Sequence, residues 1–440
     1  MYKVDSPQAE EFIHHEEILE TLEYAWSHKD NRAFIEQLIE KAALCKGLTH
    51  REAATLLECD QPDLIERIFH LAKEIKQKFY GNRIVMFAPL YLSNYCVNGC
   101  VYCPYHAKNK TIARKKLTQE EIRKEVIALQ DMGHKRLAIE AGEDPVHNPI
   151  EYILECIKTI YSVHHKNGDI RRVNVNIAAT TVENYRKLKD AGIGTYILFQ
   201  ETYNKKSYLE LHPTGPKHDY DYHTEAMDRA MEGGIDDVGL GVLFGLEGYQ
   251  YEFAGLLMHA EHLEAVHGVG PHTISVPRIK HADDIDPNVF DNSLSDELFA
   301  KIIACIRIAV PYTGMIISTR ESETIRGKVL DYGISQISGA SRTSVGGYTE
   351  KERPHDSEQF DVSDQRTLDE VVRWLMELDH IPSFCTACYR EGRTGDRFMS
   401  LCKNGQILNC CHPNALMTLT EFLVDYASDE TRNIGYEMIS

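Results

Sequence analysis

The segment CVNGCVYC, residues 96–103, places Cys96, Cys100 and Cys103 in the spacing CxxxCxxC directly after an apolar, strand-like stretch. Thiolates are typical ligands of iron–sulfur clusters, and three of them on one loop can bind three irons of a cubane. The fourth iron then stays open to another ligand. A structural zinc ion instead takes four protein ligands, and His106 could supply the fourth here, so zinc is the alternative. The segment therefore predicts a metal centre on a loop at the end of a strand.

Outward from this loop, short apolar stretches typical of buried strands alternate with longer amphipathic stretches typical of helices. The expected strands lie near residues 84–92, 136–140, 173–178, 195–200, 237–244, 273–276, 315–318 and 334–337. Eight such units over about 250 residues predict an α/β fold, namely a (β/α)₈ barrel of the TIM type. Polar, glycine-containing segments follow several of these strands, and catalytic groups in such barrels gather at the carboxyl ends of the strands.

Two further segments flank the expected barrel. Apolar residues recur at helical spacing before residue 82, so residues 1–81 are predicted to form an N-terminal helical extension. The barrel itself is expected over residues 82–346, followed by a mostly helical C-terminal domain over residues 347–440. This last domain begins with a charged, loop-like stretch at residues 347–363.

The composition limits the partners of the chain. Its 440 residues are 43% apolar and 26% charged, with a formal net charge of −19. Nucleic-acid binding depends on clustered lysine and arginine, so this charge argues against a nucleic-acid partner. Residues 1–16 are acidic and lack the features of a signal peptide, and no apolar stretch approaches the ~20 residues that span a bilayer. We therefore expect a cytoplasmic protein with neither a nucleic-acid nor a membrane partner.

A second group of cysteines lies near the C-terminus, where Cys385, Cys388 and Cys411 have the spacing CxxCx₂₂C. The chain has 12 cysteines, and in a reducing compartment grouped cysteines indicate a metal site rather than disulfides. Beside a first expected cluster, this spacing favours a second iron–sulfur cluster, with structural zinc again the alternative. A fourth zinc ligand would come from Cys402, Cys410 or His412. Because Cys410 directly precedes Cys411, the choice between these two ligands stays open.

The first cysteine motif resembles that of the radical S-adenosylmethionine (SAM) superfamily, CxxxCxφC, in which φ is aromatic; Tyr102 occupies that position. The resemblance implies a barrel whose [4Fe–4S] cluster binds SAM at its open iron. An electron then cleaves SAM to methionine and a 5′-deoxyadenosyl radical. Ala141, Gly142 and Glu143 resemble the GGE motif that contacts the SAM amine, with Ala141 in place of the first glycine. Gly241 lies on a strand that resembles the one approaching the adenosine, although small residues also pack well inside barrels.

The combination of both cysteine motifs resembles the HydG family more closely. The segment GRTGDRFM at residues 392–399 and the segments at 199–203 and 271–278 contribute to this likeness. HydG is the tyrosine lyase that matures [FeFe]-hydrogenase. The resemblance implies that tyrosine is cleaved at the first cluster to p-cresol and dehydroglycine, which the second cluster converts to CO and cyanide on iron. It also implies an extra iron at the second cluster, bound by His272 at the start of the sixth strand.

The same resemblance assigns residues to the substrate site. An arginine fork is a natural partner of the tyrosine carboxylate, and Arg320 occupies the position of the family's substrate arginine. The alternative for Arg320 is an ion pair at the rim with Glu321 or Glu323. Ser341 is the expected hydroxyl companion of Arg320, with a local turn as its alternative role. Glu201, which follows the fourth strand, is an expected cofactor-binding residue.

The sequence thus predicts a HydG-type radical SAM tyrosine lyase. Its expected partners are SAM and L-tyrosine, with free cysteine as a further candidate substrate, an electron-donor protein and other hydrogenase-maturation proteins. One alternative is a lyase similar to ThiH, the tyrosine lyase of thiamine biosynthesis, which lacks the C-terminal cysteine motif. The other alternative is a non-catalytic iron–sulfur scaffold, which would need neither a SAM site nor a carboxylate anchor.

Overall fold

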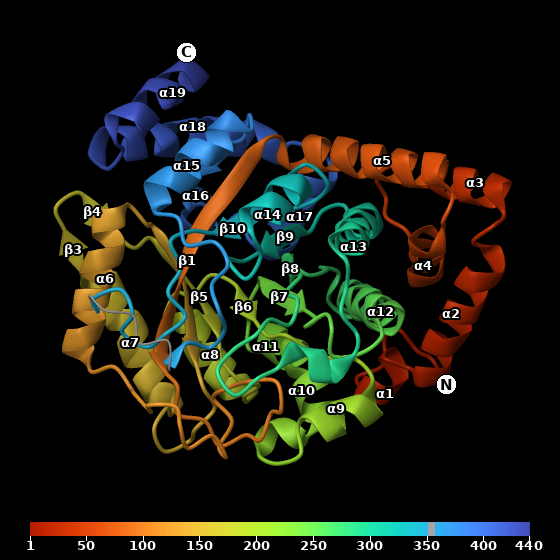
Figure 1. The fold of residues 1–440 in the computed structure, drawn as a ribbon, viewed down its shortest axis with the longest axis horizontal. Helices are drawn as coiled ribbons and strands as arrows, with labels where there is room; N and C mark the ends of the chain where they lie inside the picture. Colours follow the sequence, from red (N-terminus) through yellow and green to blue (C-terminus); the bar gives the residue numbers. More distant parts are fainter. Residues whose placement is uncertain (351–356) are drawn as a thin grey trace.

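Eight parallel strands form a closed barrel in the computed structural model, which describes residues 1–350 and 357–440. Strand β10 pairs with β1 and closes the ring (Figure 1). The barrel strands are β1 (Arg83–Ser93), β2 (Arg136–Ala141), β5 (Arg172–Asn176), β6 (Tyr196–Ile197), β7 (Val238–Gly241), β8 (Thr273–Ser275), β9 (Gly314–Ile317) and β10 (Gln336–Ser338). Each predicted strand is present, so the predicted barrel fold is confirmed.

The longest strand, β1, has 11 residues, nearly all of them buried. Its apolar sequence, RIVMFAPLYLS, fits this burial, because strands of a parallel barrel are covered on both faces. Val85 pairs with Gln336 of β10 on one side and with Ser383 on the other. Ser383 belongs to β11 (Ile381–Ser383), so the C-terminal segment adds a ninth strand to the sheet. The sequence did not predict this strand.

The interior of the barrel is arranged in rows of side chains from neighbouring strands. Tyr91 of β1 pairs with Glu140 of β2, which in turn pairs with Asn176 of β5. All three residues line one cavity inside the barrel. Side chains at matching register positions point to the same side of a sheet, and this places polar groups of three strands in one layer.

Helices connect the strands and cover the outside of the barrel (Figure 1). They are α6 (Gln119–Met132), α7 (Ile150–Ser162), α8 (Val182–Asp190), α9 (Lys205–Leu211), α10 (Tyr220–Thr224), α11 (Ala226–Glu232), α12 (Tyr249–His267), α13 (Asp296–Ala309) and α14 (Glu323–Leu330). Short additional elements are the hairpin β3 (His164–His165) and β4 (Gly168–Asp169), and the 3₁₀ helices η1 (Pro216–His218) and η2 (Pro287–Phe290).

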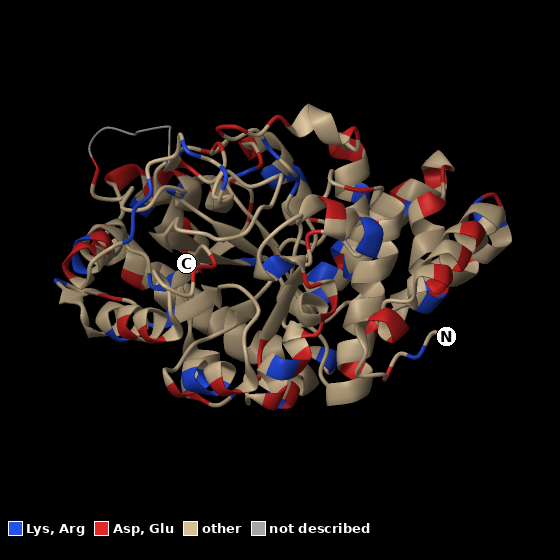
Figure 2. Ribbon diagram, turned by 90° about the horizontal axis from the view of Figure 1, so that it is seen from below, with Lys and Arg blue, Asp and Glu red and all other residues tan. Residues whose placement is uncertain are grey.

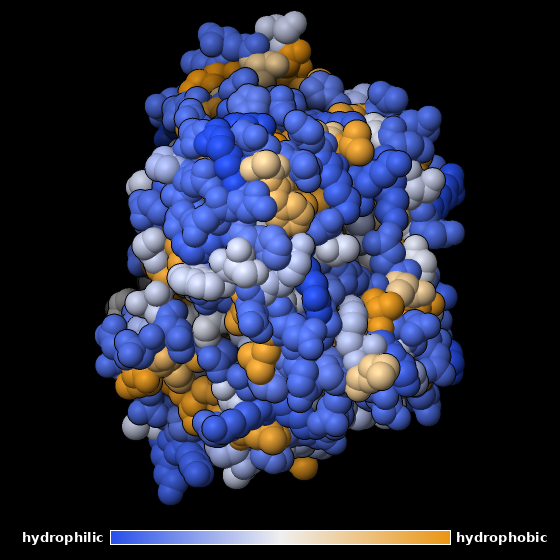
Figure 3. Space-filling view, turned by 90° about the vertical axis from the view of Figure 1, so that its right-hand side faces the viewer, coloured by the Kyte–Doolittle hydropathy of each residue, from blue (hydrophilic) through white to orange (hydrophobic). Residues whose placement is uncertain are grey.

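Five N-terminal helices lie at one side of the barrel. They are α1 (Ala9–Phe12), α2 (His15–His28), α3 (Arg32–Ala43), α4 (His50–Glu58) and α5 (Pro62–Tyr80). Of these, α1, α2, α4 and α5 pack against α12 or α13, and α3 packs against α4 and α5. Buried His50 links them to the barrel, since its ring nitrogens lie 2.9 Å from Glu17 of α2 and 2.8 Å from Glu261 of α12. The outer surface on this side is mostly hydrophilic, with small separate hydrophobic patches (Figure 3).

The C-terminal segment packs against the barrel through β11 and a buried ion pair. Its helices are α15 (Leu368–Glu377), α16 (Ala387–Arg390), α17 (Gly395–Lys403), α18 (Ile407–Asp425) and α19 (Asp429–Ile439). Asp364 lies 2.5 Å from the guanidinium of Arg326 in α14, and both side chains are fully buried. The predicted charged loop at 347–363 includes residues 351–356, which lie outside the described residues. The division of the chain at residues 82 and 347 stays a prediction.

Charged side chains of both signs are spread over the outer helices rather than segregated by element (Figure 2). Among the described residues, no helix is both long enough and apolar enough to cross a bilayer. The interior differs from this surface, because several charged groups are buried at the two ends of the barrel. These groups surround the two cavities described next.

Candidate functional site

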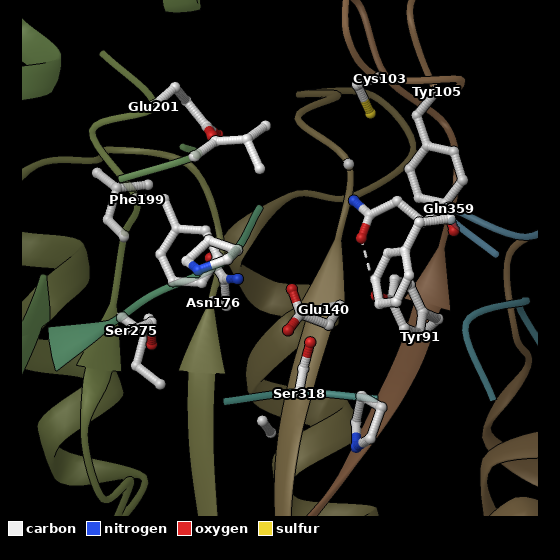
Figure 4. A pocket seen from close by; sticks show the side chains of 18 of the residues that line it. Tyr91, Cys103, Tyr105, Glu140, Asn176, Phe199, Glu201, Ser275, Ser318 and Gln359 are labelled. Carbon is white, nitrogen blue, oxygen red and sulfur yellow. Dashed lines mark hydrogen bonds between the residues drawn. The ribbon is translucent and has the colours of Figure 1, made fainter. Parts of the chain in front are cut away.

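A cavity of about 240 Å³ opens inside the barrel toward the carboxyl ends of the strands. Glu140 and Asn176 project into it from neighbouring strands, and Cys103 and Glu201 lie toward its upper end in the view of Figure 4. The cavity brings together ten of the predicted site residues. They are Cys96, Cys100, Tyr102, Cys103, Ala141, Gly142, Glu143, Glu201, Arg320 and Ser341. Gly241 is absent from its lining; a Cβ atom there would lie 2.5 Å from the ring of Phe199, which does line the cavity.

The cysteine loop is held by hydrogen bonds that cross from one barrel loop to another. The backbone N–H of Val97 donates to the carbonyl oxygen of Glu143 at 2.8 Å. The Asn98 side chain donates to the Glu143 carboxylate at 2.6 Å and accepts from the backbone N–H of Lys217 at 3.0 Å. Asn98 therefore joins three loops at the mouth of the cavity. Sequence reasoning missed this residue, because the cysteine spacing does not constrain what lies between the cysteines.

Gly142 permits the close approach of the loop after β2 to the cysteine loop. A Cβ atom at this position would lie 2.3 Å from the carbonyl oxygen of Tyr95 and 3.0 Å from the Cβ atom of Cys96. No side chain fits in that space. The glycine is thus required by its contact with the cysteine loop. Contact of this motif with SAM stays a prediction.

Cys100 is buried in this cavity, and Cys96 and Cys103 are partly exposed. Desolvation raises the pKa of Cys100 to about 11 and that of Cys103 to about 12. A coordinated metal reverses this effect and deprotonates the thiol. The zinc alternative loses its fourth ligand, since His106 points instead to Asp284, with its Nε2 3.1 Å from the carboxylate. Within residues 1–350 and 357–440, no three His, Cys, Asp or Glu side chains converge on a single-ion site. The donor set of three thiols fits a cluster with one open iron.

Tyr102 is held in place by a chain of hydrogen bonds. Its hydroxyl lies 2.7 Å from Nε2 of His212, and Nδ1 of His212 lies 2.7 Å from the carbonyl oxygen of Tyr208. Burial lowers the pKa of His212 to about 2, so the ring is neutral. Its Nδ1–H therefore donates to the carbonyl, and Nε2 accepts from the Tyr102 hydroxyl.

Glu201 adopts a backbone conformation with a φ of 68°, which is rare outside glycine. Its carboxylate lies 2.8 Å from the ammonium group of Lys217, and both side chains are largely shielded from solvent. Lys217 is a further cavity residue that sequence reasoning missed. No motif marks a lysine in the loop after α9, and only the fold brings it to the cysteine loop.

Arg320 lies in the cavity with its guanidinium 3.7 Å from the ring centre of Phe360. The rim alternative is excluded because both candidate partners are engaged elsewhere: Glu321 with Arg278, and Glu323 with Arg366 at 3.2 Å. Within the described part of the chain, the guanidinium of Arg320 has no hydrogen-bond acceptor. Arg320 is partly shielded from solvent and has no counter-ion among the described residues, so its guanidinium is available to a carboxylate in the cavity.

Two further side chains in the cavity, Ser341 and Glu140, have unusual surroundings. The Ser341 hydroxyl is buried without a hydrogen-bond partner in the described residues. Burial raises the pKa of Glu140 to about 8, against the opposing effect of Arg320. A charged residue near the carboxyl end of an apolar strand was the sequence signal that could have identified Glu140.

A second, smaller cavity of about 50 Å³ lies at the amino ends of the strands. The predicted residues Cys385, Cys388, Cys411 and His272 all line it, and His272 directly precedes β8 as expected. Nδ1 of His272 lies 3.4 Å from Asp237 and makes no hydrogen bond among the described residues. The three cysteines come from two parts of the C-terminal segment: Cys385 and Cys388 follow directly after β11, and Cys411 lies on α18.

The lining of the second cavity includes one of the alternative cysteines and three positively charged side chains. Cys411 faces it, whereas Cys402, Cys410 and His412 do not belong to its lining. The contact between Cys388 and Cys411, together with the nearby Arg393, lowers the pKa of the Cys388 thiol. Three arginines line this cavity, each with its Nε unpartnered among the described residues: Arg83, Arg136 and Arg393. Arg83 and Arg136 are buried and Arg393 is partly exposed. Cations beside thiols fit a negatively charged iron–sulfur cluster, and sequence reasoning assigned no role to these three arginines.

Comparisons with known proteins agree with this geometry. The sequence profile of the radical SAM superfamily matches residues 90–258, and that of the biotin and thiamin synthesis associated domain matches residues 275–381. The fold and the first cavity thus define a radical SAM barrel enzyme.

Among solved structures, the chain is similar to a HydG described as a maturase of the [FeFe]-hydrogenase, with 58% identity, a TM-score of 0.94 and coverage of 97% of this chain and 92% of that one. It is also similar to HydG from Carboxydothermus hydrogenoformans, with 39% identity, a TM-score of 0.84 and coverage of 98% and 94%. A 2-iminoacetate synthase of Salmonella typhimurium is 28% identical over 77% of this chain and 87% of that protein. The chain belongs to the HydG family.

Replacement of Gly142 by alanine should disrupt the first metal site. The added Cβ atom would overlap the Tyr95 carbonyl, so the cysteine loop must shift away from its position. We expect the reconstituted Gly142→Ala variant to lose iron and sulfide from this site, measured as content per chain and by electron paramagnetic resonance (EPR). Gly248→Ala is the matched control, because a Cβ atom there meets nothing within 4 Å. Full cluster content in Gly142→Ala would contradict the predicted role of this contact.

Proposed function

We propose that the protein cleaves L-tyrosine to p-cresol and dehydroglycine in the first cavity and forms CO and cyanide on iron at the second, for maturation of [FeFe]-hydrogenase. The observation that carries this proposal is the presence of two thiol-lined cavities at opposite ends of one barrel. The first also contains a free arginine suited to an amino-acid carboxylate. The names of the relatives support both halves, since dehydroglycine is 2-iminoacetate and HydG is a hydrogenase maturase.

In the proposed first site, Cys96, Cys100 and Cys103 would hold a [4Fe–4S] cluster, which would supply the electron for reductive cleavage of SAM. Glu143 and Glu201 provide acceptors at the edge of the cysteine loop, where the charged and polar groups of SAM would lie. Burial at this site excludes water, which would otherwise compete for these hydrogen bonds.

The chain's own residues orient tyrosine in the same cavity. The Arg320 guanidinium binds the substrate carboxylate in a fork, and the unpartnered Ser341 hydroxyl adds a hydrogen bond. Tyr91 donates to Gln359 at 2.8 Å, which fixes both side chains at the cavity wall. Fixed donors of this kind hold the substrate in one orientation, which is the main contribution a protein makes to radical chemistry at a cofactor.

In the proposed second site, Cys385, Cys388 and Cys411 would hold a second cluster and His272 would bind an extra iron, and this centre would supply the chemistry for conversion of dehydroglycine. The cavities lie close together inside the barrel: Val85 lines the second and Phe87, two residues on along β1, lines the first. On β2, β9 and β10 as well, the first residue that lines the first cavity comes two positions after a residue that lines the second cavity. The linings of the two cavities are therefore adjacent along these strands.

The proposal includes further partners and a compartment. Tyrosine and SAM are the substrates, and free cysteine is a candidate third. An electron-donor protein reduces the first cluster, and other hydrogenase-maturation proteins receive the iron-bound product. We assign the reaction to the cytoplasm, where thiols stay reduced.

One assay separates the proposal from its alternatives. Reconstituted protein is incubated anaerobically with SAM, tyrosine and reductant, and p-cresol, deoxyadenosine and CO are measured. Formation of p-cresol together with CO supports the HydG-type activity. Formation of p-cresol without CO would instead identify a ThiH-like lyase, and absence of deoxyadenosine would identify a scaffold.

Replacement of Arg320 by alanine should raise the KM for tyrosine while SAM still binds. Loss of a partly buried, charge-assisted pair costs about 2–5 kcal/mol, which corresponds to tens- to thousands-fold in KM. Arg320→Lys keeps the charge but loses the fork, so its KM for tyrosine should lie between those of the wild type and of Arg320→Ala. The measurement is steady-state p-cresol formation at varied tyrosine, with equilibrium SAM binding as the control. An unchanged tyrosine KM would remove Arg320 from the substrate site.

The Cys385→Ala, Cys388→Ala double variant should separate the two half-reactions. Since these cysteines line only the second cavity, we expect deoxyadenosine and p-cresol formation to continue while CO formation fails. His272→Ala should retain the second cubane but lose its extra iron, and therefore CO. EPR of the reduced proteins follows each cluster, and product analysis follows each half-reaction. Equal loss of p-cresol and CO with the first cluster intact would rule out this division.

A further inference from the structure

The buried carboxyl group of Glu252 lies behind the proposed SAM site and has no part in the chemistry described above. Glu252 is in the first turn of α12, and its side chain is fully buried. Within the described residues, no lysine, arginine or histidine forms an ion pair with it. Burial raises the pKa of this carboxyl group to about 8. An uncompensated acid in a protein interior is retained only where its oxygens make specific contacts.

The contacts of Glu252 are with the two residues that follow Glu201. The hydroxyl of Thr202 donates to Oε1, and the backbone N–H of Tyr203 donates to Oε2 at 2.9 Å. The Thr202 hydroxyl also accepts from the backbone N–H of Asn204 at 3.1 Å. One side chain of α12 therefore holds the backbone directly after Glu201.

The segment that Glu252 holds is strained. The backbone N–H of Thr202 donates to the carbonyl oxygen of Gln200 at 2.9 Å, which closes a three-residue turn with Glu201 at its centre. With its φ of 68°, Glu201 has the rare form of this turn. Such a conformation persists only where the surrounding structure enforces it. Hydrogen bonds to the next two residues are suited to that purpose.

The strained turn directs Glu201 toward the cysteine loop. Its carboxylate pairs with Lys217 at 2.8 Å, and the backbone N–H of Lys217 donates to Asn98, between the first two cysteines. Helix α12 also lies very close to this turn at Gly255, one turn after Glu252. A Cβ atom on Gly255 would lie 2.5 Å from the Cβ atom of Tyr203, so the close contact requires glycine. A continuous set of contacts thus joins α12 to the first cavity.

We propose that Glu252 is a positioning residue for SAM binding, which holds the turn at residues 200–203 so that the Glu201 carboxylate faces the donor groups of SAM. This inference rests on the proposed function, which assigns Glu201 to the SAM site. Glu252 touches neither SAM nor the metal site. Its effect passes entirely through the backbone of Thr202 and Tyr203.

The hydrogen bonds of Glu252 predict which substitutions at this position should weaken SAM binding. Glutamine at this position can donate from Nε2 to the Thr202 hydroxyl oxygen and accept from the Tyr203 N–H, so Glu252→Gln should bind SAM nearly as the wild type does. Leucine has a similar size but makes neither bond. Glu252→Leu should therefore weaken SAM binding, on the order of tenfold, while the KM for tyrosine changes little. Thr202→Val, which leaves α12 intact, should shift the SAM dissociation constant in the same direction by a smaller factor.

A matched control exists elsewhere in the chain. Glu125 of α6 is also buried, and it accepts from the backbone N–H groups of Tyr348 and Thr349 at 3.0 and 2.8 Å and from the Thr349 hydroxyl at 2.6 Å. It clamps a different loop by the same chemistry. Glu125→Leu should lower the melting temperature without changing the SAM dissociation constant.

The experiment measures the SAM dissociation constant of the cluster-reconstituted full-length variants by equilibrium dialysis, with the SAM-induced change in the cluster EPR signal as a second readout. Weaker binding in Glu252→Leu and Thr202→Val, with recovery in Glu252→Gln, supports the proposal. Wild-type SAM affinity in both Glu252→Leu and Thr202→Val overturns it. Failure of the wild-type protein itself to bind SAM would instead overturn the proposed function.

Discussion

The pairing of β1 with its neighbours is the constraint on which both cavities depend. The last residues of β1 lead into the loop of Cys96, while its first residues pair with β11, two residues before Cys385. Val85 is level with Ser383 at the end of β11, and from Val85 to the end of β1 at Ser93 the strand rises roughly 26 Å at about 3.3 Å per residue. Parallel strands place all carboxyl ends at one mouth and all amino ends at the other. Two thiol sites attached to opposite ends of one strand must therefore open at opposite mouths.

Groups that lack hydrogen-bond partners or counter-ions among the described residues are present at both of these mouths. Arg320 and the Ser341 hydroxyl at one mouth, and Arg83 at the other, lack partners that a folded protein would ordinarily provide. The buried pair of Arg326 and Asp364 shows the ordinary solution. Departures of this kind are expected where a ligand completes the set of contacts. These unpartnered groups indicate the function more specifically than the fold does, because many unrelated functions share this barrel.

The sequence predicted the features that depend on local pattern. Strand positions follow from apolar periodicity, and the ligand loops follow from cysteine spacing, so both were predictable from adjacent residues. Lys217 and Asn98 were not, because their contact exists only after the loops of β1 and β6 meet. The ninth strand, β11, has only three residues, too few for a periodic signal. Gly241 was assigned to the cofactor on family resemblance alone, whereas its tight contact is with Phe199, which faces the cavity.

The two cavities are separated by only a few residues along each strand, and this short separation matters for the proposed chemistry. Val85 and Phe87 face the same side of β1, as alternate residues of a strand do, yet they line different cavities. One layer of side chains therefore separates a site suited to an amino-acid carboxylate from a site surrounded by arginines. A small anionic product of the first site would meet positive charge at the second without crossing bulk solvent. Coulombic attraction is strong in such a water-poor interior, so the arginines of the second cavity would attract an anionic product there, as Arg320 would in the first cavity.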